Sequence, residues 1–329
     1  MTSPEAILHT SRWADWDLEQ LLHEKTRRST SVSLVIPARD EEGTVGGIVS
    51  RLHEGLVAKA QLVDEIVVID SDSSDATAEV ARDAGAIVHS AAGIRPDLGT
   101  RPGKGEAMWK SLFVTAGDVL VFMDADLTQW DTHFVTGLLG PLLTSGGVDL
   151  VKGFYDRPLT GDLAPAGGDA VSGGGRVTEL VARPLLALHW PELAGVVQPL
   201  AGEWAVRRSL LEDLTVPTGY AVELSVLVDA YERGGLGSIA QVDLGVRTHG
   251  HQALRDLGVM ALEILAMTEA RTTGRARRGE LTLRQFASGA EAVIPVDRSV
   301  VLDQRPPARS VPGYAERSTV DTSRGAASC

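Results

Sequence analysis

The chain has 329 residues, and 31 lysines and arginines against 44 aspartates and glutamates give it a formal net charge of −13 at pH 7. Such a length supplies a sizeable core in one large domain or two smaller ones. The acidic balance argues against a general binder of nucleic acid or anionic membranes, which would present a basic surface. The only cysteine is Cys329, which excludes a disulfide framework, a cysteine-based zinc site and a cysteine nucleophile within the fold.

No part of the sequence approaches the roughly 18 to 20 consecutive apolar residues that span a bilayer. The segment Met1–Lys25 is polar and lacks the basic start and apolar run of a secretion signal. We therefore expect a soluble, cytoplasmic protein that binds neither nucleic acid nor membranes.

Short runs rich in valine and isoleucine indicate strands buried on both faces of a sheet. In chain order they are Val32–Ile36, Ile66–Ile69, Ala86–Val88, Val119–Met123 and Leu150–Val151, separated by helix-like segments at 44–60, 75–84, 105–116 and 131–144. This alternation predicts an α/β fold with a doubly wound, mostly parallel sheet. Ligands bind beyond the carboxyl ends of the strands in such sheets, and three of these ends carry carboxylates.

The second half of the chain, from about Gly161, has a different texture. Its pattern predicts helices at 176–188, 221–233 and 254–272, and one strand at 239–246. Beyond Gln304 the sequence is rich in proline, arginine, serine and glycine. This composition predicts a disordered tail.

Two carboxylates, Asp124 and Asp126, directly follow the apolar run Val119–Met123. At a strand end both can point into one cleft and hold a divalent cation beside a diphosphate, because Mg²⁺ and Mn²⁺ prefer hard oxygen ligands. The same pattern, followed by Thr128, also fits a haloacid-dehalogenase-type phosphatase with Asp124 as nucleophile. Three strands precede it, whereas that motif usually opens its domain. Two solvated loop aspartates are the third interpretation.

The segment Arg101–Ala107 places Lys104 between two glycines ahead of a helix. Glycine permits close approach of the backbone to a phosphate, and a helix N-terminus favours an anion. The spacing matches neither a P-loop nor a dinucleotide fingerprint. An ordinary glycine turn with a surface lysine is the alternative.

Two further segments hold candidate ligands. Gly173–Glu179 combines a glycine run with Arg176 and Thr178 and can bind a phosphate or carboxylate, or can be a flexible linker. Arg247–His249 ends a predicted strand, and a neutral imidazole suits Mn²⁺. His251 competes with His249 for that role.

Taken together, these segments resemble the glucosyl-3-phosphoglycerate synthases, which are GT-A glycosyltransferases similar to family 2 (family 81). The resemblance runs from roughly Val32 to His249 and rests on the motifs Pro37–Glu42, Asp70–Asp75, Arg101–Ala107 and Gly173–Pro184. Two residues depart from the pattern. Asp40 replaces the usual asparagine, and Ala125 stands where the family often has serine.

The resemblance implies transfer of glucose from UDP-glucose to the 2-hydroxyl of 3-phosphoglycerate with retention of the α anomer. It also implies a Mg²⁺ or Mn²⁺ cofactor and a homodimer. Asp126 and His249 would bind the metal, and Glu223, Lys104 and Asp126 would carry the catalysis. Glu203 is an alternative to Glu223 for polarising the acceptor.

The resemblance assigns two groups of binding residues. The donor side takes Pro37, Ala38, Arg39, Glu41, Asp70, Ser71, Lys104, Asp124, Ala125, Asp126 and Glu223. The acceptor side takes Gly175, Arg176, Thr178 and Arg247.

The expected organisation has four parts: an N-terminal helical arm at 1–30, a nucleotide-sugar-binding GT-A half at 31–160, an acceptor-binding and metal-completing half at 161–273, and a variable, largely disordered tail at 274–329. Besides the phosphatase, the alternatives are a non-catalytic nucleotide-sugar binder and a transferase with another sugar nucleotide or phosphorylated acceptor.

Overall fold

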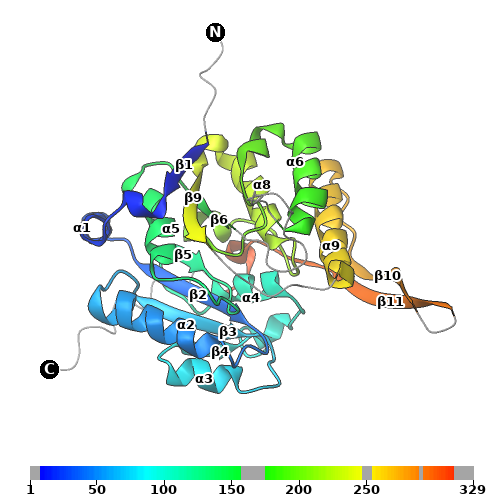
Figure 1. Ribbon diagram of the computed structural model, residues 1–329, viewed down its shortest axis with the longest axis horizontal. Helices are drawn as coiled ribbons and strands as arrows, with labels where there is room; N and C mark the ends of the chain where they lie inside the picture. The colour runs from blue at the N-terminus through cyan, green and yellow to red at the C-terminus, as the bar shows by residue number, and fades with distance from the viewer. Residues whose placement is uncertain (1–7, 157–174, 247–253, 289–291, 315–329) are drawn as a thin grey trace, which may run out of the picture.

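The computed structural model describes residues 8–156, 175–246, 254–288 and 292–314. Its centre is an eight-stranded sheet with the spatial order β1-β9-β6-β7-β5-β2-β3-β4 (Figure 1). In that order the strands span His9–Arg12, Ile239–Val246, Leu150–Asp156, Trp204–Arg207, Val119–Phe122, Val32–Ala38, Glu65–Asp70 and Ile87–Ser90. All neighbours pair in parallel except β7, which is antiparallel to β5 and β6. The predicted mostly parallel α/β sheet is confirmed.

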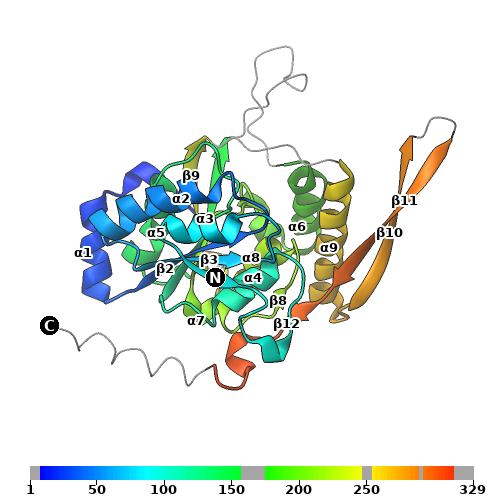
Figure 2. The same ribbon diagram turned by 90° about the horizontal axis from the view of Figure 1, so that it is seen from below.

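Helices cover both faces of the sheet (Figures 1 and 2). They are α1 (Leu18–Arg28), α2 (Val45–Leu52, followed by a π-helical segment at His53–Lys59), α3 (Thr77–Asp83), α4 (Lys104–Ser111), α5 (His133–Thr144), a π-helical turn (Thr178–Ala182) leading into α6 (Arg183–His189), α7 (Arg208–Leu211), α8 (Val222–Gly234) and α9 (Leu254–Thr273). Each predicted helical segment overlaps one of these helices.

Two apolar cores lie on opposite faces of the sheet because side chains alternate along a strand. In β2, Val35 belongs to the core beneath α4, α6 and α8, whereas Leu34 and Ile36 belong to the core beneath α1, α2 and α5. Burial on both faces explains why these strands read as continuous apolar runs. The apolar runs form the strands, and parallel pairing of β2, β3 and β5 places their polar carboxyl ends along one edge of the sheet.

The N-terminal segment contains more than the predicted helical arm. Helix α1 is present, but β1 precedes it and pairs in parallel with residues 240–243 of β9. The strand His-Thr-Ser-Arg has no apolar run, because it lies at the sheet edge and is largely exposed. The helical arm predicted at 1–30 therefore contains an edge strand, β1, in addition to helix α1.

The segment predicted to be a largely disordered tail from residue 274 contains ordered structure. Strands β10 (Gly279–Ser288) and β11 (Val293–Leu302) form an antiparallel hairpin that projects from the body beside α9 (Figures 1 and 2). A short strand, β12 (Gln304–Arg305), then pairs with β8 (Val216–Pro217). The prediction is wrong for these elements, because β10 and β11 are ordered by pairing with each other and β12 by pairing with the distant β8. Within the described residues, no helix is long and apolar enough to cross a membrane.

Candidate active site

The polar ends of β2, β3 and β5 meet at one edge of the sheet. Ala38 pairs in register with Asp70, and the Ser71 N–H donates to the Ala38 carbonyl over 2.9 Å. The N–H of Met123, one residue before Asp124, donates to the Val35 carbonyl over 3.1 Å. The predicted donor-side residues of these three strand ends therefore lie close together.

The loops after β2 and β3 are tied to each other. Asp40 Oδ1 accepts hydrogen bonds from the Ser74 N–H (2.7 Å) and hydroxyl (3.0 Å), and the Glu41 N–H donates to Thr77 Oγ1 over 2.7 Å. Asp40 has a φ of +55°, a left-handed conformation that aspartate and asparagine tolerate best. Aspartate can replace the asparagine usual in the family, because both side chains tolerate this conformation and both offer the oxygen that accepts the hydrogen bonds from Ser74.

Carboxylates gather at this edge. Burial raises the pKa of Glu41, and the nearby Asp126 and Asp124 raise it further, although the Thr44 hydroxyl bonded to it acts in the opposite direction. Asp126 is exposed to solvent beyond β5. In addition, Oδ1 of the buried Asp70 has no hydrogen-bond partner in the part of the chain that the structure describes. Such a site favours a cation and a ligand with hydrogen-bond donors.

Lys104 occupies the centre of the site, at the first residue of α4. Its Nζ lies 2.5 Å from Asp124 Oδ1 and 2.8 Å from Glu223 Oε1, and its side chain is 17% exposed. Burial by itself would lower the pKa of Lys104, but the two carboxylates outweigh burial and raise the pKa above its ordinary value. The lysine is therefore a fixed positive charge at a helix N-terminus, where an anion is favoured.

The glycines around Lys104 allow its loop to lie directly on β8. A Cβ at Gly103 would overlap the carbonyl oxygen of Thr218, and one at Gly105 would overlap that of Pro217. Gly103 also has a φ of +120°, which a side chain would strain. The glycine pattern thus reflects close backbone packing beneath the lysine, in addition to any approach of a phosphate.

Two predicted glutamates have different surroundings. Glu223 lies in the first turn of α8, is 5% exposed and pairs with Lys104. Glu203 precedes β7 and is fully buried. Of the two glutamates, Glu223 is the one that forms an ion pair with Lys104.

Sequence reasoning missed Lys152, a buried lysine in β6. Its Nζ donates to the Ala201 carbonyl over 2.7 Å and lies 5.7 Å from the centroid of the Trp204 ring. Burial lowers the pKa of Lys152 to about 8. The available signal was a lysine directly after the apolar pair Leu150–Val151 in β6. The Lys152 side chain joins β6 to the segment just before β7.

A second missed group is Glu263 of α9. The Tyr220 N–H donates to its carboxylate, which lies so close to Gly219 that a Cβ there would overlap it. Burial raises the pKa of Glu263 to about 7, with a smaller contribution from Glu223. Helix α9 is thereby joined to the loop that precedes α8.

The predicted acceptor residues are described only in part. Gly175 and the exposed Arg176 lead into the π-helical turn that begins at Thr178, whose side chain is buried. Arg247 and His249 lie outside the described residues.

The donor set of the described residues fits a hard divalent cation in part. Asp126 offers an exposed carboxylate, whereas Asp124 is already bonded to Lys104. Within the described ranges, no three aspartate, glutamate, histidine or cysteine side chains form a metal-binding group. A metal at Asp126 thus needs ligands from a bound molecule or from elsewhere in the chain.

Comparison with known proteins is consistent with this site. Residues 33–162 match the family model for glycosyl transferase family 2. The glucosyl-3-phosphoglycerate synthase of Mycolicibacterium smegmatis is 45% identical over 91% of this chain and 95% of its own length. That of Petrotoga mobilis is 39% identical over 92% and 93%.

Solved structures agree in fold. A crystal structure of glucosyl-3-phosphoglycerate synthase from Mycobacterium tuberculosis, in complex with Mn²⁺, UDP and phosphoglyceric acid, superposes with a TM-score of 0.80 at 40% identity, covering 92% of this chain and 98% of that one. A structure of that enzyme with Mg²⁺ and UDP gives 0.80 at 39% identity, covering 92% and 99%. With this identity sustained over nearly the full length of both chains, the chain belongs to the glucosyl-3-phosphoglycerate synthase family of GT-A glycosyltransferases.

Proposed function

We propose that the chain transfers glucose from UDP-glucose to the 2-hydroxyl of 3-phosphoglycerate, with retention of the α anomer and release of UDP. The observation that carries this proposal is Lys104, held between Asp124 and Glu223 at the sheet edge where ligands of α/β proteins bind. The M. tuberculosis relative has been solved with Mn²⁺, UDP-glucose and phosphoglyceric acid, and with UDP and glucosyl-3-phosphoglycerate.

On the donor side, the loop after β2 and the end of β3 hold the nucleoside. Pro37, Ala38, Arg39, Glu41 and Ser71 surround the uracil and ribose, and Asp70 Oδ1 accepts a hydrogen bond from the nucleotide. Lys104 is presented to the diphosphate, where its charge opposes the negative charge that builds on departing UDP. Ala125 has no hydroxyl with which to contact the ribose, so neighbouring groups near β5 make that contact instead.

Asp126 and His249 hold the divalent cation, Mg²⁺ or Mn²⁺. When bound, the cation neutralises the leaving diphosphate as a Lewis acid. On the acceptor side, Gly175, Arg176, Thr178 and Arg247 bind the carboxylate and phosphate of 3-phosphoglycerate. Their role is to orient the 2-hydroxyl toward the anomeric carbon.

The contact between Glu223 and Lys104 holds both side chains at the same place in the site. Glu223 binds sugar hydroxyls and steadies the lysine. Retention then follows from attack on the same face that UDP leaves, with the leaving phosphate accepting the proton of the acceptor hydroxyl.

The direct test is incubation with UDP-glucose, 3-phosphoglycerate and Mg²⁺ or Mn²⁺, with UDP and the glucosylated product measured by chromatography. A panel of sugar nucleotides and phosphorylated hydroxy acids defines the specificity. Donor binding with no turnover across the panel would identify a binding protein instead. Phosphate release from 3-phosphoglycerate without UDP would support the phosphatase, which the comparisons do not favour.

We further propose that the enzyme acts as a cytoplasmic homodimer. The projecting β10–β11 hairpin exposes large apolar side chains, with Phe286 62% and Val293 68% exposed, and such side chains often mark a protein interface. Light scattering coupled to size exclusion should give twice the chain mass. A monomer mass would contradict the assembly while leaving the activity unaffected.

A further inference from the structure

We propose that Arg305, in the C-terminal strand β12, is a positioning residue for the Lys104 loop and thereby for binding of the donor diphosphate. The Lys104 loop comprises residues 98–106, which run from the end of a short 3-10 helix (Pro96–Leu98) into the first turn of α4. The inference rests on the proposed function, because it assigns Lys104 to the diphosphate of UDP-glucose. The inference adds to the site a residue that is 199 positions from Glu106 in the sequence.

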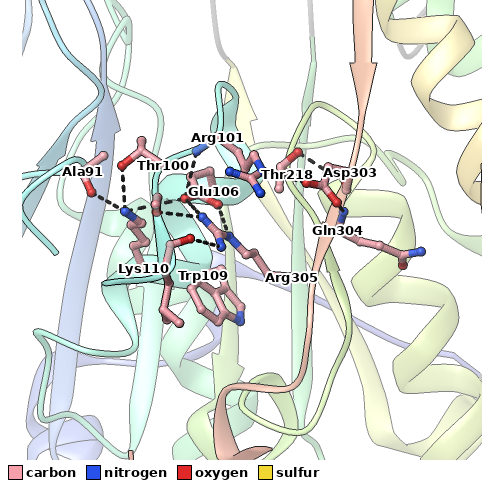
Figure 3. Close-up of polar contacts among 12 residues, drawn as sticks. Ala91, Thr100, Arg101, Glu106, Trp109, Lys110, Thr218, Asp303, Gln304 and Arg305 are labelled. Carbon is pink, nitrogen blue, oxygen red and sulfur yellow. Dashed lines mark hydrogen bonds and ion pairs between the residues drawn. The ribbon is translucent and has the colours of Figure 1, made fainter. Parts of the chain in front are cut away.

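The central contact is a buried ion pair between Arg305 and Glu106 (Figure 3). Arg305 Nε donates to Glu106 Oε2 over 2.7 Å, and its NH2 group donates to Oε1 over 2.5 Å. Glu106 is 1% exposed and Arg305 8%. A two-pronged pair of this kind fixes orientation as well as distance, which a lysine cannot reproduce.

The same guanidinium also holds the beginning of the loop. Its NH1 and NH2 groups donate to the carbonyls of Leu98 and Gly99, each over 2.9 Å. Glu106 Oε1 accepts the Arg101 N–H over 3.2 Å. Both ends of the nine-residue segment that contains Lys104 are therefore attached to one side chain, directly or through Glu106.

The loop also rests on the strand to which β12 is paired. The Glu106 N–H donates to the Thr218 carbonyl over 2.9 Å, and the Thr218 N–H donates to the Asp303 carbonyl over 3.1 Å. Asp303 in turn accepts Arg101 Nε over 2.7 Å. Figure 3 shows these residues as one connected group around Arg305.

A rigid loop matters because Lys104 must stay between Asp124 and Glu223 while an anion approaches. Without the Arg305 fork, Glu106 keeps a buried charge next to Lys110, whose Nζ lies 3.7 Å from Oε1. The carboxylate would turn toward that lysine, and the first turn of α4 would turn with it. The donor-binding step should then suffer before acceptor binding does.

The test uses the full chain and the variants Arg305→Lys and Glu106→Gln. We expect the KM for UDP-glucose to rise about tenfold, a size typical of coupling within one hydrogen-bond network. The KM for 3-phosphoglycerate should change by less than about twofold, because sites that share no contacts are energetically almost independent. Calorimetry with UDP and Mn²⁺ should show weaker binding in the same proportion.

Arg309→Lys is the matched control. Arg309 lies in the same C-terminal segment and pairs with Glu212, so its loss loosens that segment without touching the loop. Equal effects of Arg309→Lys and Arg305→Lys, equal changes in both KM values, or an unchanged KM for UDP-glucose in folded Arg305→Lys would overturn the proposal.

If Arg305→Lys does not fold, as judged by circular dichroism, Glu106→Gln decides by the same criteria. Absence of UDP release by the wild-type enzyme would instead refute the proposed function. In that case UDP calorimetry on the variants still tests the positioning role.

Discussion

Replacing Glu263 by glutamine should stabilise the protein at neutral pH. The carboxyl group accepts the Tyr220 N–H, and its pKa is raised from 4.5 to about 7, chiefly by burial. Above pH 7 the folded protein must therefore keep a largely desolvated negative charge next to Gly219 and near Glu223. Glutamine retains an oxygen for the Tyr220 N–H and carries no charge.

The magnitude follows from linkage between protonation and folding. A pKa of about 7 in the folded chain against 4.5 in the unfolded chain corresponds to about 3 kcal/mol of unfolding free energy. Because the side chain is partly accessible to solvent, we expect about 2 to 3 kcal/mol. The protonated carboxyl group contributes this unfolding free energy in full below pH 4.5. The contribution is lost as the pH rises toward 7 and is absent at higher pH.

Urea denaturation of wild type and Glu263→Gln at intervals between pH 4.5 and 8 measures this difference. The free energy of unfolding of the variant minus that of wild type should grow through this window and then level off. Glu269→Gln, an exposed position on the same helix, serves as the control and should show no such rise. A difference that is constant with pH, or that shrinks toward pH 8, would refute the reasoning.

Three further changes test the site. Lys104→Met leaves Asp124 and Glu223 facing each other without their cation, so urea denaturation should show a loss of about 3 to 5 kcal/mol, and adding Glu223→Gln should restore part of it. Asp126→Ala should lower kcat at least about a hundredfold at every Mn²⁺ concentration, as expected for loss of a charge-stabilising group; full activity would contradict the metal assignment. Arg176→Ala should raise the KM for 3-phosphoglycerate by about tenfold or more, as for loss of a charged hydrogen bond, and a larger effect on UDP-glucose would show that the acceptor site is misplaced.

Most strands of the central sheet were predictable because burial on both faces leaves a strong sequence signal. The antiparallel strand β7 was not predicted, although it is buried between β5 and β6. The runs around Val35, Val67 and Val121 contain almost no polar residue, and the carboxylates that follow them mark the ligand edge. Parallel pairing then brings those ends together regardless of their separation along the chain. Local patterns therefore identify the strand ends at which a ligand binds, whereas the individual donor-side roles come from the family resemblance.

Edge and surface elements lack such a signal. Strand β1 is mostly polar, and the apolar residues of β10 are interrupted by polar ones, so neither strand contains a hydrophobic run. The ion pair of Arg305 with Glu106 joins residues 199 positions apart, and no local pattern identifies a partner at that range. Glu263 was missed for the same reason, because burial of its carboxyl depends on how α9 meets Tyr220.

The single reversed strand, β7, has a consequence for how such an enzyme can diversify. Strand β6 ends and β7 begins at the same edge of the sheet, since the two are antiparallel neighbours. The whole stretch between Asp156 and Trp204, Arg176 and Thr178 included, thus leaves and re-enters the scaffold on one side. Leu186 and Leu193 of this stretch belong to the same apolar core as Trp204 of β7. A segment exchanged with a relative that uses another acceptor can therefore enter and leave between the same two strands, provided that it keeps these core positions.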